Sequence, residues 1–260
     1  MDEQSAPTPQ QLQGLSVNFQ GLKNNPEKIE YLKEIAQSDN VGMILCCETW
    51  LDENIDNVEV GIPGFNVFRT DRKHRIRGGS AIYLKKNFCV DESRLLKFCN
   101  DVCEVTALII EDCDIALISL YRPPDTCSSE FKEALDAVKL WFEENCTDNT
   151  HVLFYGDFNF PWLSWYKLES SDTLGHTLKP GSTNDEKKQS KELLSFMSSN
   201  FLLQTVHELT NNCNTVDLQF TNSDIFSSPY VMPTTISDHD FLCWSVNLML
   251  NNNQPASNAG

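Results

Sequence analysis

Several features of secreted, membrane-spanning and zinc-binding proteins are missing from this sequence of 260 residues. It has ten cysteines but no CxxC pair, and no cluster of Cys and His stands at the spacing of zinc ligands. The adjacent Cys46 and Cys47 lie inside an apolar run and would point to opposite faces of a strand. We therefore expect free, buried thiols in a reducing compartment rather than a disulfide framework.

A secretory leader and a membrane span are also missing. The N-terminal segment MDEQSAPTPQQ has neither a basic region nor an apolar core, and no apolar stretch approaches the length that crosses a bilayer. We expect an intracellular protein, nuclear or cytoplasmic and not secreted, with no membrane partner.

Basic residues are scarce. The chain has 20 Lys and Arg against 37 Asp and Glu, which gives a net charge of -17. This balance argues against loose, nonspecific DNA binding and suits a site that recruits cations, although the local field at a site counts for more than the total charge. Positive residues gather in RTDRKHRIRGG, residues 69–79. This segment is either a solvated loop or, with Arg75 and Arg77 before two glycines, a contact to the DNA backbone.

What the sequence does contain is an alternation of apolar runs with amphipathic segments. We expect disordered ends at residues 1–11 and 251–260 and one domain over residues 12–250. Helices are predicted over residues 24–40, 128–145 and 184–200, and strands over residues 12–17, 41–47, 80–84, 105–110, 114–120, 151–155, 215–220 and 241–250. Many strands with few helices favour an α/β (α+β) sandwich of two packed sheets flanked by helices.

Polar residues stand at the tips of these predicted strands. They are Asn18, Glu48, Tyr121, Asp157 with Asn159, Asp217, and the segment Ser237-Asp238-His239. Singly, each has an ordinary reading, as a helix cap, a turn residue or a solvent-facing histidine. Their occurrence at successive strand tips favours one shared site. In an extended segment Asp157 and Asn159 would point to the same face, toward a metal, a phosphate or each other.

Metal-assisted hydrolysis of a phosphodiester needs such a set. Glu48, with Asn18 nearby, suits a hard cation such as Mg²⁺. Asp157 and Asn159 could serve as base and orienter of the attacking water. His239, Tyr121 and Asn159 could donate hydrogen bonds to phosphate oxygens, and Asp217 is the best candidate to fix the tautomer of His239.

These motifs together resemble a known family. The segments SVNFQGL, ILCCETWL, RGGSAIYL, LYRPP, YGDFNFPW, TVDLQFTN and ISDHDFL resemble, in this order, the endonuclease/exonuclease/phosphatase superfamily, and the likeness runs from about residue 12 to residue 248. The resemblance implies a DNase I-like, four-layer sandwich with two mostly antiparallel sheets. Several details look like one branch, the endonuclease domain of non-LTR (LINE-type) retrotransposons, which nicks DNA so that a reverse transcriptase can prime on the freed end.

The resemblance also implies roles for residues. Asn18 and Glu48 would hold Mg²⁺ or Mn²⁺, with Asp238 assisting. Asp157 and Asn159, Tyr121 and His239, and Asp217 would take the catalytic roles given above. Thr210 matches a threonine that the branch places near a DNA phosphate, and Ser237, Arg75 and Arg77 are further candidate substrate contacts. The implied partner is double-stranded DNA, with a reverse transcriptase domain in full-length relatives, and we expect a monomer.

Two departures leave alternatives open. Gln20 stands where DNA-repair relatives usually carry an aspartate, which disfavours a repair enzyme. No reverse transcriptase is present in this sequence, so we expect a fragment, a truncated copy or a domesticated gene product. A phosphatase or lipid phosphodiesterase of the superfamily, and a catalytically idle relic of a mobile element, are the competing interpretations.

Overall fold

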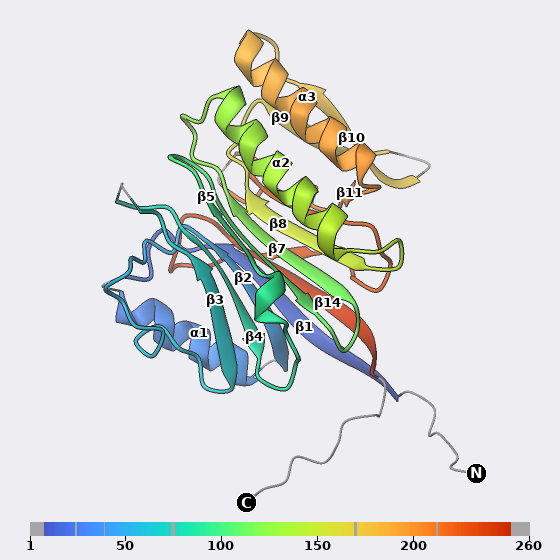
Figure 1. Cartoon of the computed structure of the whole chain (residues 1–260). Coiled ribbons are helices and arrows are strands. Elements are labelled where there is room, and N and C mark those ends of the chain that lie inside the picture. The colour runs from blue at the N-terminus through green and yellow to red at the C-terminus, as the bar shows by residue number, and fades with distance from the viewer. Residues whose placement is uncertain are drawn as a thin grey trace, which may run out of the picture.

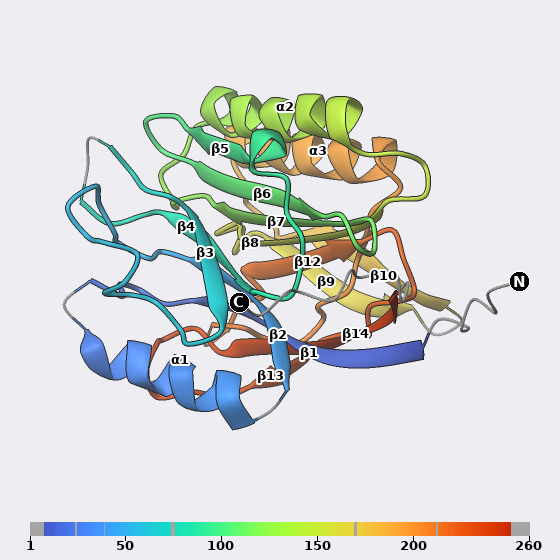
Figure 2. The same cartoon turned by 60° about the horizontal axis from the view of Figure 1, so that its bottom comes forward.

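Two six-stranded sheets pack face to face between layers of helices (Figures 1 and 2). The computed structural model describes residues 8–23, 25–38, 40–73, 76–168, 171–211 and 213–250. One sheet has the order β13 (Tyr230–Met232), β14 (Phe241–Leu250), β1 (Thr8–Asn18), β2 (Val41–Cys47), β4 (Ser80–Lys85) and β3 (Phe65–Thr70). The other has the order β11 (Leu203–Gln204), β12 (Asp217–Thr221), β8 (His151–Asp157), β7 (Ile115–Tyr121), β6 (Glu104–Ile110) and β5 (Leu96–Cys99).

Three α-helices cover the outer faces of the sheets in the described part of the chain. Helix α1 (Pro26–Ser38) lies on the first sheet, and α2 (Ser128–Asn145) and α3 (Asn184–Ser199) lie on the second (Figure 2). A 3₁₀ turn (Glu92–Arg94) and a two-stranded hairpin, β9 (Leu163–Leu168) with β10 (Ser171–Leu178), complete the fold. No helix among the described residues is long and apolar enough to cross a membrane.

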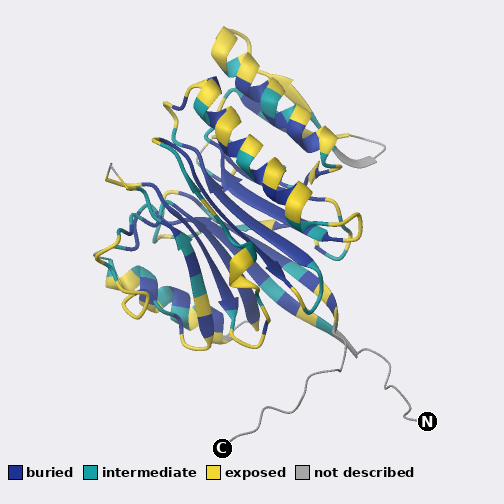
Figure 3. Cartoon of the chain, viewed as in Figure 1, coloured by how far each residue is buried: buried dark blue, intermediate teal, exposed yellow. Residues whose placement is uncertain are grey.

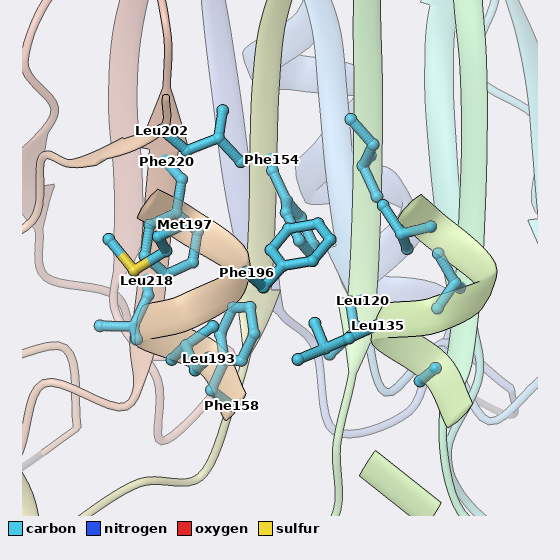
Figure 4. Close-up of a cluster of buried hydrophobic side chains, with 14 of the residues drawn as sticks. Leu120, Leu135, Phe154, Phe158, Leu193, Phe196, Met197, Leu202, Leu218 and Phe220 are labelled. Carbon is cyan, nitrogen blue, oxygen red and sulfur yellow. The ribbon is translucent and has the colours of Figure 1, made fainter. Parts of the chain in front are cut away.

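The core has three parts, one in each gap between layers. The gap between the sheets is filled from both sides by aliphatic side chains, including Leu45, Ile82, Leu117 and Leu153. A second cluster joins α2 and α3 to the second sheet, as Figure 4 shows for Leu135, Phe196, Phe154 and Phe220. A third joins α1 to the first sheet. The layering confirms the predicted four-layer, DNase I-like sandwich.

The central strands follow directly from the apolar runs. All seven residues of β2, of β6 and of β7 are buried, because layers cover both faces of these strands (Figure 3). The strand pairs are antiparallel except β1 with β2 and β7 with β8, which are parallel. A parallel pair needs a crossover, and α1 and α2 supply it between the two strands of each pair.

The structure adds elements that the sequence does not announce. Strands β3, β5, β9, β10, β11 and β13 lie outside the predicted set. The predicted disordered end at residues 1–11 is wrong for its last four residues, since β1 begins at Thr8 and pairs with the end of β14 (Thr8 opposite Leu250). Edge pairing supplies the backbone hydrogen bonds that side-chain composition does not reveal. Residues 1–7 and 251–260 lie outside the described residues.

Candidate active site

The predicted site residues come from strand ends that meet at one edge of both sheets. Asn18, Tyr121 and Asp157 are the last residues of β1, β7 and β8, and Glu48 directly follows β2. The two sheets touch at this edge, where the Cys47 Sγ donates to the carbonyl oxygen of Leu120 at 3.0 Å. Parallel pairs put their carboxyl ends at the same edge, so β1, β2, β7 and β8 deliver all four side chains there.

Two antiparallel strands bring the remaining residues to the same edge from the other direction. Strand β12 begins at Asp217, which lies directly opposite Asp157 in the β12–β8 pair. His239 precedes β14, whose first residues pair with the end of β1. Residues separated by as much as 221 positions in the sequence therefore share one site.

Asn18 links two carboxylates. Its Nδ2 donates to Asp157 Oδ2 at 2.8 Å and lies 3.3 Å from Glu48 Oε1, while its own Oδ1 accepts from the backbone N–H of Gln20 at 3.0 Å. Trp50 Nε1 donates to the other oxygen of Glu48 at 2.9 Å. Each carboxylate oxygen has two lone pairs, so Glu48 keeps acceptor capacity after these bonds.

Asp157 and Asn159 lie side by side, as predicted, but for a different reason. β8 ends at Asp157, and Asn159 has a positive φ of 49° in a tight turn rather than in an extended segment. The backbone N–H of Asn159 donates to Asp157 Oδ1 at 3.0 Å, and its Nδ2 donates to Asp157 Oδ2 at 2.9 Å. Asparagine tolerates this backbone conformation better than most residues, so the turn and not strand alternation joins the pair.

Asp217 and His239 form a buried pair. His239 Nδ1 lies 2.6 Å from Asp217 Oδ2, and the hydroxyl of Tyr155 donates to Asp217 Oδ1 at 3.1 Å. His239 is further held by Ser237, whose Oγ accepts from the backbone N–H of His239 at 3.2 Å and donates to the carbonyl of Asn18 at 2.7 Å. The carboxylate fixes the imidazole so that Nε2 points away from Asp217.

Burial and neighbouring charges at this edge shift the pKa values of Asp157 and His239. Burial, and then the charge of Asp217, raises the pKa of Asp157 to about 8. Burial alone would lower the pKa of His239, but Asp217 and the other nearby carboxylates outweigh it and raise that pKa to about 10. At neutral pH His239 is thus a cation that can donate from Nε2, and Asp157 favours any bound cation or proton that offsets its charge.

The donor set fits a divalent cation. Ligand atoms of Asp157, Asp217 and His239 all lie within 4.8 Å of one another and could hold a metal ion. His239 Nδ1 and Asp217 Oδ2 are, however, engaged with each other. Glu48 and Asp157 offer oxygen ligands around the same amide of Asn18, the donor type that Mg²⁺ prefers. Asp238, with a half-exposed side chain, lies 3.8 Å from His239 Nε2 on the open side of the site.

The other predicted contacts are differently placed. Thr210 is fully buried, and its hydroxyl oxygen accepts from the backbone N–H groups of Val216 and Asp217, so it supports the start of β12. Tyr121 is also buried; burial and then the charge of Glu48 raise its pKa, which keeps the phenol neutral and able to donate. Arg75 lies outside the described residues. Arg77 is exposed, with its guanidinium 5.2 Å from the centre of the Trp50 ring.

The basic segment 69–79 is only partly a surface loop. Arg69 donates to the carbonyl of Asp52 at 3.2 Å and pairs with Asp71, also at 3.2 Å. Arg72 pairs with the buried Glu104 and lies over the ring of Tyr121 at 5.6 Å. Arg69 and Arg72 are therefore engaged in ion pairs within the protein. Within the described part of the segment, Lys73 and Arg77 are the exposed cations.

A residue that the sequence interpretation missed is Arg122, next to Tyr121. It is fully buried, yet all of its hydrogen-bond acceptors are neutral: Gln189 Oε1 at 2.9 Å and the carbonyls of Phe158, Asn159 and Thr126 at 3.0 to 3.3 Å. Its own carbonyl accepts from Asn159 Nδ2 at 2.8 Å. Arg122 thus clamps the turn that carries Asp157 and Asn159. The signal was present in the sequence as a charge between an apolar strand and two prolines, in LYRPP.

Replacing Arg122 by methionine should lower the free energy of unfolding by at least about 3 kcal/mol. The change leaves several buried carbonyls without a donor, each costing roughly 1–3 kcal/mol. Arg122→Lys should lose less, because an ammonium can still satisfy some of the acceptors. Urea denaturation of both variants measures the difference, with Lys132→Met on the exposed face of α2 as a control that should not shift the midpoint. A methionine variant as stable as the parent would contradict the clamp.

Comparisons with known proteins agree with this arrangement. Residues 115–243 match the sequence model of a family described as Endonuclease-reverse transcriptase. No curated protein is significantly similar in sequence. Among solved structures, the endonuclease domain of TRAS1, a telomere-specific non-LTR retrotransposon, is similar with 16% identity and a TM-score of 0.59, over 90% of this chain and 98% of that chain.

Enzymes with other substrates share the fold. An AP endonuclease from Leishmania major is similar with 12% identity and a TM-score of 0.63, over 91% of this chain and 87% of that chain. A mannosyl-6-phosphatase from Bacteroides thetaiotaomicron has 14% identity and a TM-score of 0.57, over 90% and 98%. At these identities the likeness establishes the fold, and the substrate has to be argued from the site.

Proposed function

We propose that this chain is a member of the endonuclease/exonuclease/phosphatase superfamily, which its fold and the family match over residues 115–243 support, and that it is a divalent-metal-dependent DNA endonuclease of the non-LTR retrotransposon type. The observation that carries the proposal is the union, at one sheet edge, of the Asp217–His239 pair with the Asn18–Glu48–Asp157 group. The match to the Endonuclease-reverse transcriptase family supports the retrotransposon branch. In a longer protein, the freed 3′ end would then serve a reverse transcriptase domain.

The residues divide the work by their charge and hydrogen bonds. Above its pKa of about 8, or once a cation bound beside Glu48 lowers that pKa, Asp157 is ionised and accepts a proton from the attacking water. Asn159, fixed to Asp157 at 2.9 Å, orients that water. His239, charged and held by Asp217, donates from Nε2 to a phosphate oxygen as negative charge develops there. The neutral phenol of Tyr121 offers a second donor. Asp217 stays on the far side of the imidazole and never touches the phosphate.

Glu48 and Asn18 would hold Mg²⁺, or Mn²⁺ with the same ligands, and Asp238 would assist from the open side. When bound there, the cation would stabilise negative charge on the phosphate oxygens. The convergence of Glu48 and Asp217 on Asp157, which raises the pKa of that carboxyl, supports this assignment because a bound cation would offset their combined negative charge. A DNA substrate also favours a nuclear site of action.

Nicking of supercoiled plasmid tests the proposal. The protein should convert supercoiled circles to relaxed circles with Mg²⁺, and a chelator should abolish the reaction. Glu48→Ala should slow it at least about a hundredfold, the scale of losing one stabilising group in a transition state. Folded protein that relaxes no plasmid with Mg²⁺ or Mn²⁺ would overturn the proposal, and release of phosphate from a sugar phosphate would favour the phosphatase interpretation instead.

A further inference from the structure

A cavity of about 810 Å³ lies beside the candidate active site. The proposed mechanism assigns no function to this cavity. It is bordered by the loop after β2, the end of β3 with the loop that follows it, and β5. Its charged lining is formed by Asp52, Glu53, Arg69, Asp71, Arg72, Lys73 and Lys97.

Most of these charges are already neutralised inside the protein. Arg69 pairs with Asp71, Arg72 with Glu104, and Asp52 with Lys23. Lys73 and Lys97 are exposed, and neither forms an ion pair with another described residue. Glu53 is the one remaining carboxylate of the lining. The cavity is therefore locally positive on a chain of net charge -17, and it favours an anion.

Arg72 and Glu104 connect the wall of the cavity to Tyr121 at the candidate active site. The guanidinium of Arg72 lies in its wall and also over the ring of Tyr121, and Glu104, its ion-pair partner, lies opposite Tyr121 in the β6–β7 pair. Glu104 Oε2 also accepts from the backbone N–H of Gly79 at 2.9 Å, which fixes the end of the loop that carries Lys73. An anion held here would lie immediately beyond Tyr121.

We propose that this cavity is a subsite for a backbone phosphate of the bound DNA, next to the scissile one, held by Lys73 and Lys97. The inference rests on the proposed endonuclease function. It accounts for how a strongly acidic protein engages a polyanion: two lysines unpaired among the described residues stand in a cavity that adjoins the reacting phosphate, while the lysines of α2 pair with Asp136 and Glu143 on their own helix.

The test uses the double variant Lys73→Gln/Lys97→Gln and the matched control Lys132→Gln/Lys139→Gln on α2. Rates of nicking of a short duplex are measured with Mg²⁺ at several salt concentrations. We expect the KM of the cavity variant to rise about tenfold with kcat unchanged. Its salt dependence should weaken by a slope of up to about 2, because each lost phosphate contact removes about 0.9. The control should behave as the parent protein.

The outcomes separate the two proposals. If the parent protein nicks DNA and the cavity variant keeps the parental KM and salt slope, the subsite is wrong and the endonuclease stands. If the parent protein nicks nothing, the endonuclease itself has failed. A third arm measures thermal stabilisation by inorganic phosphate. Stabilisation that the cavity variant loses, with an unchanged KM for DNA, would mean a site for small anions and would also overturn the subsite.

Discussion

Asp157→Asn should slow plasmid nicking about a thousandfold while the protein stays folded. The change keeps the size of the side chain but removes its capacity to accept a proton, an effect of roughly 10²–10⁴ in rate for a general base. It also spoils the hydrogen bonds, because Asp157 accepts from the backbone N–H of Asn159 through one oxygen and from two amide groups, Asn18 Nδ2 and Asn159 Nδ2, through the other. An asparagine would have to turn its own NH₂ toward one of these donors.

The fold should survive because burial raises the pKa of Asp157 to about 8, so the side chain is already largely neutral at pH 7 and asparagine replaces it with another neutral group of the same size. The donor left without an acceptor should cost roughly 1–3 kcal/mol, which is less than the stability of about 5–15 kcal/mol of an ordinary domain. Single-turnover nicking and urea denaturation of the same preparation measure both effects, with Asp136→Asn on the exposed face of α2 as the control. Parental nicking by Asp157→Asn would remove Asp157 from the catalytic assignment and leave the fold assignment untouched.

Asp217→Asn should cause a comparable or larger loss, up to about 10⁴, and the loss should depend on pH. The carboxylate holds His239 in one orientation and keeps its pKa high; an asparagine does neither, as is known for aspartate-to-asparagine changes behind a catalytic histidine. The pKa of His239 then falls, because burial lowers it and its strongest stabilising charge is gone. The variant needs the protonated imidazole, so its rate relative to the parent should rise as the pH falls from 8 to 6.

The ratio of the two rates is the readout, and it reports two groups: removing the charge of Asp217 lowers the pKa of Asp157 as well as that of His239, and both changes make the ratio rise as the pH falls. Tyr155→Phe is the matched control: it removes only the 3.1 Å hydrogen bond to Asp217 and should cost about tenfold or less, with no pH-dependent ratio. A ratio for Asp217→Asn that stays flat between pH 6 and 8 would show that Asp217 acts through structure alone and not through the charge of His239.

Much of the fold was predictable from local patterns. Continuous apolar runs such as residues 41–47 and 105–110 form strands that are buried on both faces. Such runs can be recognised in a sequence because a strand with one face in solvent would alternate apolar and polar residues instead. The strands that escaped prediction are short or at edges, where backbone pairing rather than burial defines them. β5 and β13 span only four and three residues and contain no fully buried residue, so neither forms an apolar run long enough to be recognised as a strand.

The order and identity of the polar residues at strand tips were set by the sequence alone, and so was the chemistry they suggest: carboxylates and amides for a hard cation, and a histidine with a carboxylate. Their roles remain predictions until the variants are measured. The tertiary structure decided which of the charged residues form ion pairs within the protein and which are exposed and able to contact a ligand. Arg69 and Arg72 belong to a basic segment that the sequence leaves open between a solvated loop and a DNA contact, yet they pair with Asp71 and Glu104.

The same holds for Arg122, Thr210 and the Asp157–Asn159 pair. Their partners lie in other elements or in a turn whose positive φ no periodicity announces. The physical reason is that a side chain's residue type fixes which interactions it can make, while its partners are set by turns, strand pairing and layer packing, which for Arg122 bring in Gln189 from 67 residues away. The sequence determined what chemistry could occur at this edge, and the packing of the two sheets decided which groups take part and which hold them in place.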